Sequence, residues 1–335
     1  MSENKINTAE NILSIKDLTV TFESREIGVC EAVNHFSLDI RKGETIGLVG
    51  ETGAGKTTVA LSILRLLQTP PAKVKSGEIL YEGQDVLKFN KTQLHEFRGK
   101  SASMIFQDPM TALNPIETVG DQLAEVIRIH NKVSKAESIE MAKQMLVRVG
   151  ISPERSVEYP HQFSGGMKQR VIIAIALSCN PSLLLADEPT TALDVTIQAQ
   201  VMDMMEELKE QLGTSVLLIT HDLGVVAEMC DRVAIMYAGE IVEIGTVVDI
   251  FDHTSHPYTL GLLNSLPRLA GNASRLKAIP GLMPDPTSLP KGCSFADRCE
   301  YATEECRACK HELTEISDGH WVRCIHRLTE NGGQA

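Results

Sequence analysis

Residues 50–57 read GETGAGKT and decide the fold of this 335-residue chain. They fit the pattern G-x-x-x-x-G-K-[S/T], whose glycines let backbone N–H groups wrap a triphosphate. The apolar run TIGLVG leads into them as a strand, and TVALSILRLL follows at helical spacing and stops before TPP. Because a helix N-terminus favours negative charge, this strand, loop and helix together predict a phosphate site.

The loop provides a continuous set of expected nucleotide contacts, namely Gly50, Glu51, Thr52, Gly53, Ala54, Gly55, Lys56, Thr57 and Thr58. We expect the Lys56 ammonium to reach the β- and γ-phosphates and the Thr57 hydroxyl to coordinate Mg²⁺. A glycine-rich loop that arises by chance is the alternative, and the strand and helix on either side argue against it.

A second apolar stretch, LLLADE, ends in two carboxylates, Asp187 and Glu188. At the C-terminal end of a buried strand beside the loop, the first can hold Mg²⁺ and the second can orient and deprotonate the attacking water. We therefore assign Asp187 to the metal and Glu188 to the general base. LLITHD is likewise an apolar strand that ends in a polar residue, and it places His221 where it can contact the γ-phosphate. A capping or core histidine is the alternative.

The order of predicted strands and helices indicates an α/β fold. Residues 13–50 alternate β-rich runs with turns, residues 92–180 are mainly helical and indicate an inserted lobe, and β-α alternation then returns. Such alternation is typical of a parallel sheet buried on both faces. Beyond residue 253 the composition shifts to Pro, Gly and Ser, so we expect a main domain over 1–253 and a smaller extension over 254–335.

Charge and hydropathy exclude several classes of function. The formal charge of −12 argues against a nucleic-acid surface, which needs clustered Lys and Arg. The longest apolar stretches, such as VIIAIAL at 171–177, fall short of the roughly 18 to 20 residues that a bilayer crossing needs. The N-terminus lacks a basic start followed by an apolar run, so we expect no secretory signal and a cytoplasmic location.

The stretch FSGGMKQR at 163–170 resembles a second phosphate cradle, because Ser164, Gly165 and Gly166 open a predicted helix. Taken alone the signal is weak, and an ordinary helix N-cap with flexible glycines is the better explanation. One nucleotide cannot obviously use both cradles, since the second belongs to the helical lobe.

The motifs GETGAGKT, FQDP, FSGGMKQR, LLLADEP, TTALD and ITHD, in this order, closely resemble those of the ATP-binding subunits of ABC transporters. The resemblance implies a P-loop nucleotide-binding domain with a RecA-like parallel-sheet core, an antiparallel β subdomain and an inserted helical lobe. It also implies head-to-tail dimers in which each SGG loop caps the ATP held by the partner's P-loop. The second cradle would then serve the other subunit.

Several residue roles follow from this resemblance alone. Gln107 would lie at the Mg²⁺ and the attacking water, Ser164 and Gly166 at the partner's γ-phosphate, and Asp194 between the two sites. Phe22 matches the aromatic residue expected to stack on adenine, although a buried strand phenylalanine is the alternative. The family's signature loop reads L-S-G-G-Q, and here Phe and Met replace its first and last residues.

Three further stretches narrow the resemblance to the D-type subunits of dipeptide and oligopeptide importers: QDPMTALNP at 107–115, HPYTLGLLNSLP at 256–267 and IPGLMPDPTSLPKGCSFADRC at 279–299. The implied partners are a second ATPase subunit, two transmembrane permeases and an extracytoplasmic peptide-binding protein, at the cytoplasmic face of the membrane. A heterodimer is favoured by the resemblance alone, and a homodimer stays open. Import of nickel or sugars, a soluble ABC ATPase without a membrane partner, and a metal-sensing module are the alternative functions.

Cysteines crowd into the predicted extension as Cys293-x5-Cys299-x6-Cys306-x17-Cys324. Four thiols gathered in a reducing compartment suggest a metal centre, since lasting disulfides are not expected there. The resemblance implies a [4Fe–4S] cluster with a structural role; Zn²⁺ and unliganded thiols are the alternatives. Cys309 is an additional cysteine that could compete as a ligand or take no part.

Overall fold

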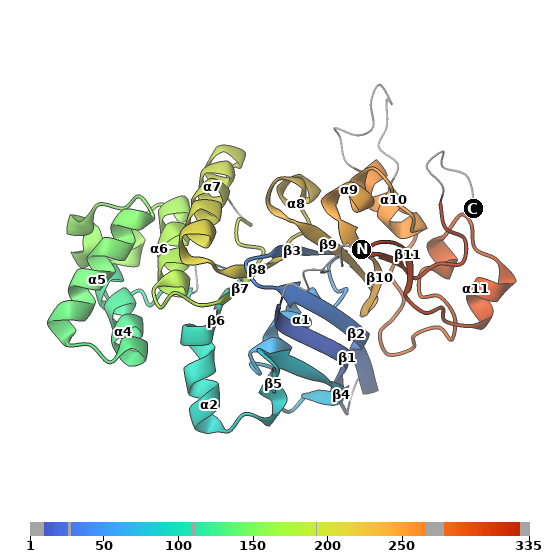
Figure 1. The fold of residues 1–335 in the computed structure, drawn as a ribbon, viewed down its shortest axis with the longest axis horizontal. Helices are drawn as coiled ribbons and strands as arrows, with labels where there is room; N and C mark the ends of the chain where they lie inside the picture. Colours follow the sequence, from blue (N-terminus) through green and yellow to red (C-terminus); the bar gives the residue numbers. More distant parts are fainter. Residues whose placement is uncertain (1–9, 26–27, 109–111, 192, 266–277, 329–335) are drawn as a thin grey trace, which may run out of the picture. The chain divides into compact units, whose positions relative to one another are not determined.

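The computed structural model describes residues 10–25, 28–108, 112–191, 193–265 and 278–328, which form two compact units (Figure 1). The first unit comprises Met1–Ser14, Asp39–Thr45 and Leu80–Leu218, and the second comprises Ile15–Leu38, Ile46–Ile79 and Ile219–Ala335. Parts of the predictions lie outside the described residues: the absence of a secretory signal (1–9), and portions of QDPMTALNP (109–111), TTALD (192) and HPYTLGLLNSLP (266–267).

The first unit contains a set of parallel strands and most of the long helices. Its elements are β5 (Gln84–Asp85), η1 (Val86–Lys88), α2 (Lys91–Glu96), η2 (Phe97–Ser101), β6 (Ala102–Ile105), α4 (Val119–Asn131), α5 (Lys135–Arg148), η3 (Pro153–Val157), η4 (Pro160–Gln162), α6 (Gly165–Leu177), β7 (Leu183–Asp187), α7 (Val195–Leu212) and β8 (Ser215–Ile219). Its strand order is β8-β7-β6, and β6 runs parallel to β7 with Ala102 opposite Leu183. Helices α4 and α5 pack side by side (Figure 1).

The second unit contains the glycine-rich loop and the C-terminal region. Its elements are most of β1 (Asn11–Ser24), β2 (Gly28–Arg41), β3 (Thr45–Val49) and β4 (Ala72–Tyr81), and all of α1 (Lys56–Ile63), α8 (Leu223–Met229), β9 (Arg232–Tyr237), β10 (Glu240–Thr246), α9 (Val247–Phe251), α10 (Pro257–Asn264), η5 (Ala296–Arg298), α11 (Glu304–Ala308), β11 (Thr314–Ser317) and β12 (His320–Val322). One sheet has the order β2-β1-β4, and the other the order β11-β12-β10-β9-β3.

The pairing in the second sheet explains how the C-terminal region is attached. Strand β3 runs parallel to β9, with Ile46 opposite Arg232, whereas β10 pairs antiparallel with β9 and β12 pairs antiparallel with β10. The last strands of the chain therefore extend the sheet that carries the glycine-rich loop. Since backbone hydrogen bonds of a sheet edge need a partner, β12 also covers an otherwise open edge of β10.

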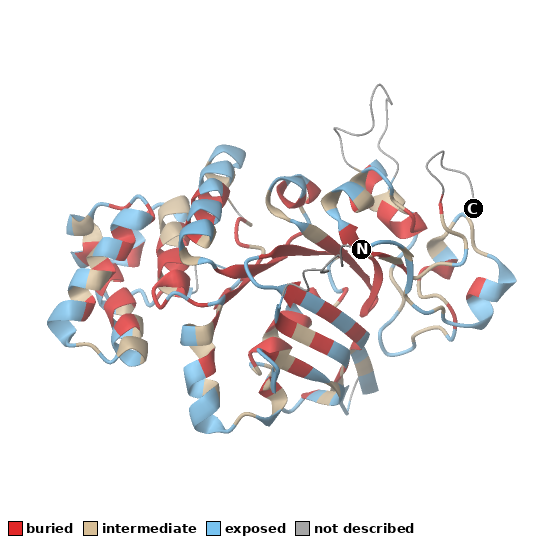
Figure 2. Ribbon diagram, viewed as in Figure 1, coloured by how far each residue is buried: buried red, intermediate tan, exposed pale blue. Residues whose placement is uncertain are grey.

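The apolar runs predicted as buried strands are buried along their whole length. All residues of β3, β7 and β8 are buried (Figure 2). Helices α4 and α5 lie in the region predicted to be mainly helical, and α7 ends at Gly213, which adopts a φ of 65°. The predicted helical region is interrupted at ASMI, residues 102–105, which form a strand that pairs with β7.

Candidate nucleotide site and cysteine cavity

The glycine-rich loop lies between β3 and α1 in the second unit, as the sequence predicts. Gly55 is the N-cap of α1 with a φ of 105°, a conformation that residues with a Cβ rarely adopt. A Cβ at Gly55 would also overlap the carbonyl oxygen of Ala32, and one at Gly50 would overlap that of Met236. The loop can follow this path only with glycine at both positions.

The Lys56 side chain is folded back onto its own loop. Its ammonium donates to the carbonyl oxygens of Gly50 at 2.6 Å and Glu51 at 3.0 Å, and the residue is only 7% exposed. A cation held over the loop, next to the first turn of a helix, forms a site for a phosphate group. Thr57 is exposed and Thr58 is partly exposed beside it.

The carboxylates predicted for metal binding and catalysis lie in the first unit, at the end of β7. Asp187 is 2% exposed as the last residue of the strand, and Glu188 follows it with a φ of 47°. The Gln107 amide donates to Glu188 Oε2 at 3.0 Å, and the Thr191 hydroxyl donates to the same oxygen at 2.9 Å. Gln107 and Glu188, 81 positions apart, are thus brought together.

The second cradle has the geometry of a helix N-terminus. Ser164 is the N-cap of α6 and accepts a hydrogen bond from the backbone N–H of Met167 at 3.4 Å. Ser164 and Gly165 are exposed, and a Cβ at Gly166 would overlap the side chain of Ile197. Asp194 is the exposed N-cap of α7 and accepts from Ile197 N–H at 3.0 Å. The cradle faces solvent and contacts the start of α7.

Two further predicted residues lie at exposed or half-exposed positions of the second unit. Phe22 in β1 is partly exposed while Thr21 before it is buried, so its ring is not enclosed in the core. His221 is exposed, two residues beyond the end of β8. Both side chains are accessible to a ligand.

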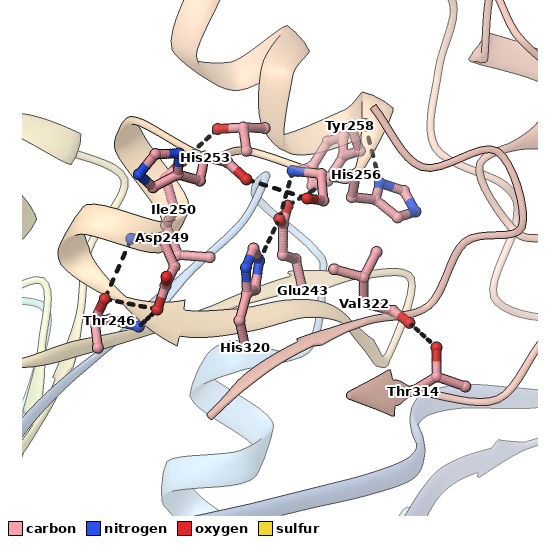
Figure 3. A network of polar contacts seen from close by, with 12 residues as sticks. Glu243, Thr246, Asp249, Ile250, His253, His256, Tyr258, Thr314, His320 and Val322 are labelled. Carbon is pink, nitrogen blue, oxygen red and sulfur yellow. Dashed lines mark hydrogen bonds and ion pairs between the residues drawn. The ribbon is translucent and has the colours of Figure 1, made fainter. Parts of the chain in front are cut away.

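The sequence did not point to a buried polar network that supports the glycine-rich loop from the C-terminal region. Glu243 in β10 accepts hydrogen bonds from the backbone N–H groups of Ser255 at 2.7 Å and His256 at 3.1 Å, and His320 Nε2 lies 2.9 Å from its carboxylate (Figure 3). His256 Nδ1 in turn accepts from Tyr258 N–H at 3.0 Å. Burial lowers the pKa of His256 to about 3, so the ring stays neutral and can accept this bond.

This network fixes the start of α10. Glu243 is fully buried and His320 is 2% exposed, so the contacts join β10, β12 and the residues that precede the helix inside the core. A buried carboxylate is stable only when hydrogen bonds replace its water shell, and Glu243 has several. The HPY sequence that begins α10 was noted as a family feature, but its spacing carries no signal for such partners.

The four spaced cysteines gather around one small apolar cavity in the second unit. Cys293, Cys299, Cys306 and Cys324 line it together with side chains from His256, His311 and His326. The backbone supports this arrangement, since Cys293 N–H donates to Cys306 O at 2.7 Å. Cys309 is exposed and is not part of the lining, and its thiol is directed to Glu305 O at 3.7 Å.

Four cysteine side chains are the number and type of donor that a thiolate-ligated metal centre uses. Burial, with the neighbouring thiols Cys293, Cys299 and Cys306 adding to it, raises the pKa of Cys324 to about 12. Cys324 therefore remains a thiol unless a positive charge beside it lowers its pKa, as a bound metal does. Within the described ranges, no group of three or more His, Cys, Asp or Glu side chains forms a ready-made site for a metal ion.

Comparison with known proteins assigns the chain to a family. Residues 33–191 match the family described as ABC transporter, and residues 242–306 match the family described as oligopeptide/dipeptide transporter, C-terminal region. The dipeptide transport ATP-binding protein DppD of Bacillus subtilis is 50% identical over 317 residues, covering 94% of each chain. This chain belongs to the ATP-binding subunits of peptide ABC transporters. The oligopeptide transport ATP-binding protein OppD of the same organism is 48% identical, covering 93% of this chain and 88% of that one.

Solved structures agree on the fold of this ABC ATPase. The ATP-binding cassette MJ0796, in a dimeric post-hydrolysis state bound to ADP and Pi, aligns with a TM-score of 0.63 and 27% identity, covering 70% of this chain and 98% of that one. CbiO1 of Clostridium perfringens aligns with a TM-score of 0.62 and 26% identity. The predicted α/β ABC-type fold and ATPase activity are therefore confirmed. Among the described residues, no helix combines the length and the hydrophobicity required to span a bilayer.

Proposed function

We propose that this ATPase drives the uptake of dipeptides or oligopeptides through an ABC importer. We infer the class of cargo from the C-terminal region, because its residues 242–306 match the oligopeptide/dipeptide transporter family. DppD and OppD, named for dipeptide and oligopeptide transport, resemble the chain over more than nine tenths of its length. Import of nickel or sugars by the same type of assembly is the competing assignment.

The nucleotide of an ABC ATPase is ATP with Mg²⁺, and the residues of the site divide the work. Lys56 and the loop N–H groups hold the β- and γ-phosphates, while Thr57, Gln107 and Asp187 hold the Mg²⁺. Glu188 deprotonates the attacking water and His221 contacts the γ-phosphate. What supports this assignment is the loop geometry and, separately, the contact between Gln107 and Glu188.

Two such subunits act as a pair. Ser164, Gly165 and Gly166 cap the nucleotide of the partner subunit, Asp194 lies between the two sites, and Phe22 stacks on adenine. The exposure of Ser164, Gly165 and Asp194 supports these roles, because only accessible groups can meet a partner. The partner is a second, distinct ATPase subunit, and the pair works with two transmembrane permeases and an extracytoplasmic peptide-binding protein. Residues 1–253 form the ATPase domain and 254–335 its extension, bound peripherally at the cytoplasmic face.

The cysteine cavity holds a [4Fe–4S] cluster, with Zn²⁺ as the competing ligand. The four lining cysteines match the thiolate count that such a cluster needs. When bound, the cluster would supply iron–sulfur bonds that join segments of the extension, which are otherwise held mainly by short helices and loops. Cys309 lies outside the cavity and takes no part.

Cys324→Ser tests the cluster. We expect protein purified without oxygen to be brown and to contain about four iron atoms per chain, and the variant to lose most of that iron because one ligand is missing. Cys309→Ser is the matched control and keeps its iron. About one zinc per chain and no iron would assign the cavity to zinc instead, and neither metal in the wild-type protein would show that the proposal is wrong.

Uptake in cells tests the cargo. Cells that carry the wild-type chain or an inactive variant are given labelled dipeptides, oligopeptides, nickel and sugars in parallel. We expect loss of peptide uptake alone. Loss of nickel or sugar uptake with normal peptide uptake would change the cargo, and no change in any uptake would favour a soluble ABC ATPase.

A further inference from the structure

Glu51, the second residue of the glycine-rich loop, is held from two sides by the C-terminal region. Its backbone N–H donates to the hydroxyl of Tyr258 at 3.0 Å, and its carboxylate accepts from Arg298 at 3.0 Å. Tyr258 belongs to α10 and Arg298 is the last residue of η5. All of these residues lie in the second unit.

The groups that hold Glu51 are themselves firmly placed. Tyr258 is fully buried, and the Arg298 side chain is 7% exposed. Arg298 also donates to the Tyr237 hydroxyl at 3.2 Å, and its guanidinium lies 5.7 Å and 5.9 Å from the ring centres of Tyr237 and Phe295. Burial raises the pKa of Tyr258, so its hydroxyl stays neutral and can accept from Glu51. Packing therefore restricts the movement of both the Tyr258 and the Arg298 side chain.

The contact between Arg298 and Glu51 affects nucleotide binding because it places a positive charge beside the carboxylate of Glu51. The carbonyl oxygen of Glu51 accepts from the Lys56 ammonium at 3.0 Å and from Ala54 N–H at 3.1 Å, so Glu51 belongs to the same turn as the phosphate-binding lysine. An unpaired carboxylate in this turn would compete for Lys56 and repel a triphosphate. Arg298 offsets the charge of that carboxylate; its own side chain is 7% exposed and that of Glu51 is 30% exposed, so water screens the pair only in part.

We propose that Arg298 and Tyr258 are positioning residues of the ATP site, through which the C-terminal region sets the affinity of the glycine-rich loop for ATP. Tyr258 fixes the first peptide of the loop, and Arg298 offsets the charge of Glu51. Since Arg298 lies between Cys293 and Cys299, both of which line the cysteine cavity, the same short segment joins that cavity to the loop. The inference rests on ATP binding at this loop, as assigned under the proposed function.

Equilibrium binding of Mg²⁺–ATP to the full-length chain tests the proposal. We expect Arg298→Ala to raise the Kd about tenfold, equivalent to about 1.4 kcal/mol, and Arg298→Lys to restore part of the affinity. Tyr258→Phe keeps the ring but removes the acceptor, and should raise the Kd about threefold. Arg307→Ala is the matched control, because this exposed arginine of the same extension has its ion pair with Asp297 only at 3.8 Å; its Kd should equal that of the wild type.

Glu51→Gln separates a charge effect from simple loss of a structural contact. If Arg298 acts by neutralising Glu51, Glu51→Gln should lower the Kd about threefold, and adding Arg298→Ala to it should change the Kd less than twofold. If the pair were merely structural, both single variants would weaken binding equally, and the proposal would be overturned. An unchanged Kd in Arg298→Ala would overturn it as well.

If Arg298→Ala leaves the Kd unchanged, Lys56→Ala shows whether the positioning role or the assignment of ATP to this loop is wrong. Loss of binding in Lys56→Ala with an unchanged Kd in Arg298→Ala means that ATP binds at this loop and only the positioning role is wrong. Unchanged binding in Lys56→Ala means that the nucleotide binds elsewhere, and the site assignment falls together with the inference.

Discussion

Glu188→Gln should lower the ATPase turnover number by about 10²- to 10⁴-fold, the usual contribution of a general base. The substitution keeps the shape of the side chain and an oxygen that can accept from Thr191, but it removes the group that takes the proton from water. ATP binding should be retained, because the amide does not add negative charge beside the phosphates. The variant should therefore accumulate as an ATP-bound dimer with its partner, measured by size-exclusion chromatography with and without ATP.

Glu206→Gln is the matched control for this experiment. Glu206 is an exposed glutamate of α7 in the same unit, so its replacement should leave turnover unchanged. Undiminished turnover in Glu188→Gln would remove this residue as the base. Glu188 also has a φ of 47°, a backbone conformation that non-glycine residues rarely adopt and that occurs at functional sites.

Gly55→Ala should abolish ATP binding, raising the Kd at least about 100-fold. Two effects combine: the residue has a φ of 105°, and a Cβ would overlap the backbone carbonyl of Ala32, so the loop must leave its path. Strain of this kind costs about 1–3 kcal/mol, and a backbone overlap adds to it. The measurement is Mg²⁺–ATP binding, with the thermal unfolding midpoint recorded to confirm that the variant is folded.

Gly83→Ala is the control that separates the effect of a Cβ overlapping the backbone from the effect of a strained, positive φ. Gly83 also has a positive φ, 79°, but a Cβ there would meet open space. This control should lose a small amount of stability and bind ATP normally. If Gly55→Ala bound ATP as tightly as Gly83→Ala, the loop would tolerate a different path, and the tight geometry at Gly55 would not be needed for phosphate binding.

The parts of the site that the sequence predicts are those determined by neighbouring residues. The loop at 50–57, the buried strands that precede it and precede Asp187, and the helix cap at Ser164 are all local patterns. Glycine, an apolar run or a capping serine restricts its own segment of backbone, so the pattern can be recognised without the rest of the fold.

The support of Glu51 could not be predicted in this way. Tyr258 and Arg298 are 207 and 247 positions away along the chain, and no periodicity or spacing connects residues so distant. Their meeting depends on how β9 and β10 pair and on where α10 begins. The strand at 102–105 could not be predicted for the same reason. A segment this short and apolar becomes a strand only when it pairs with a neighbour, here β7.

The cysteines lie between these two cases. Their spacing suggested a shared ligand, but only the fold shows that Cys309 is exposed while the other four line one cavity. Cys306 and Cys309 form the short pair that zinc sites often use, and the structure separates them. The family resemblance, and not spacing alone, had set these four cysteines apart from Cys309, and the cavity has the same four in its lining.

ATP-dependent peptide accumulation in vesicles tests the central claim most directly. The chain is assembled in liposomes with the ATPase partner, permeases and binding protein proposed above, and labelled di- and oligopeptides are supplied on the binding-protein side. We expect accumulation that requires ATP on the side of the ATPase subunits and is lost in the Glu188→Gln assembly. Accumulation that is equal without ATP, or equal with Glu188→Gln, would contradict the conclusion that this chain drives peptide import by hydrolysing ATP.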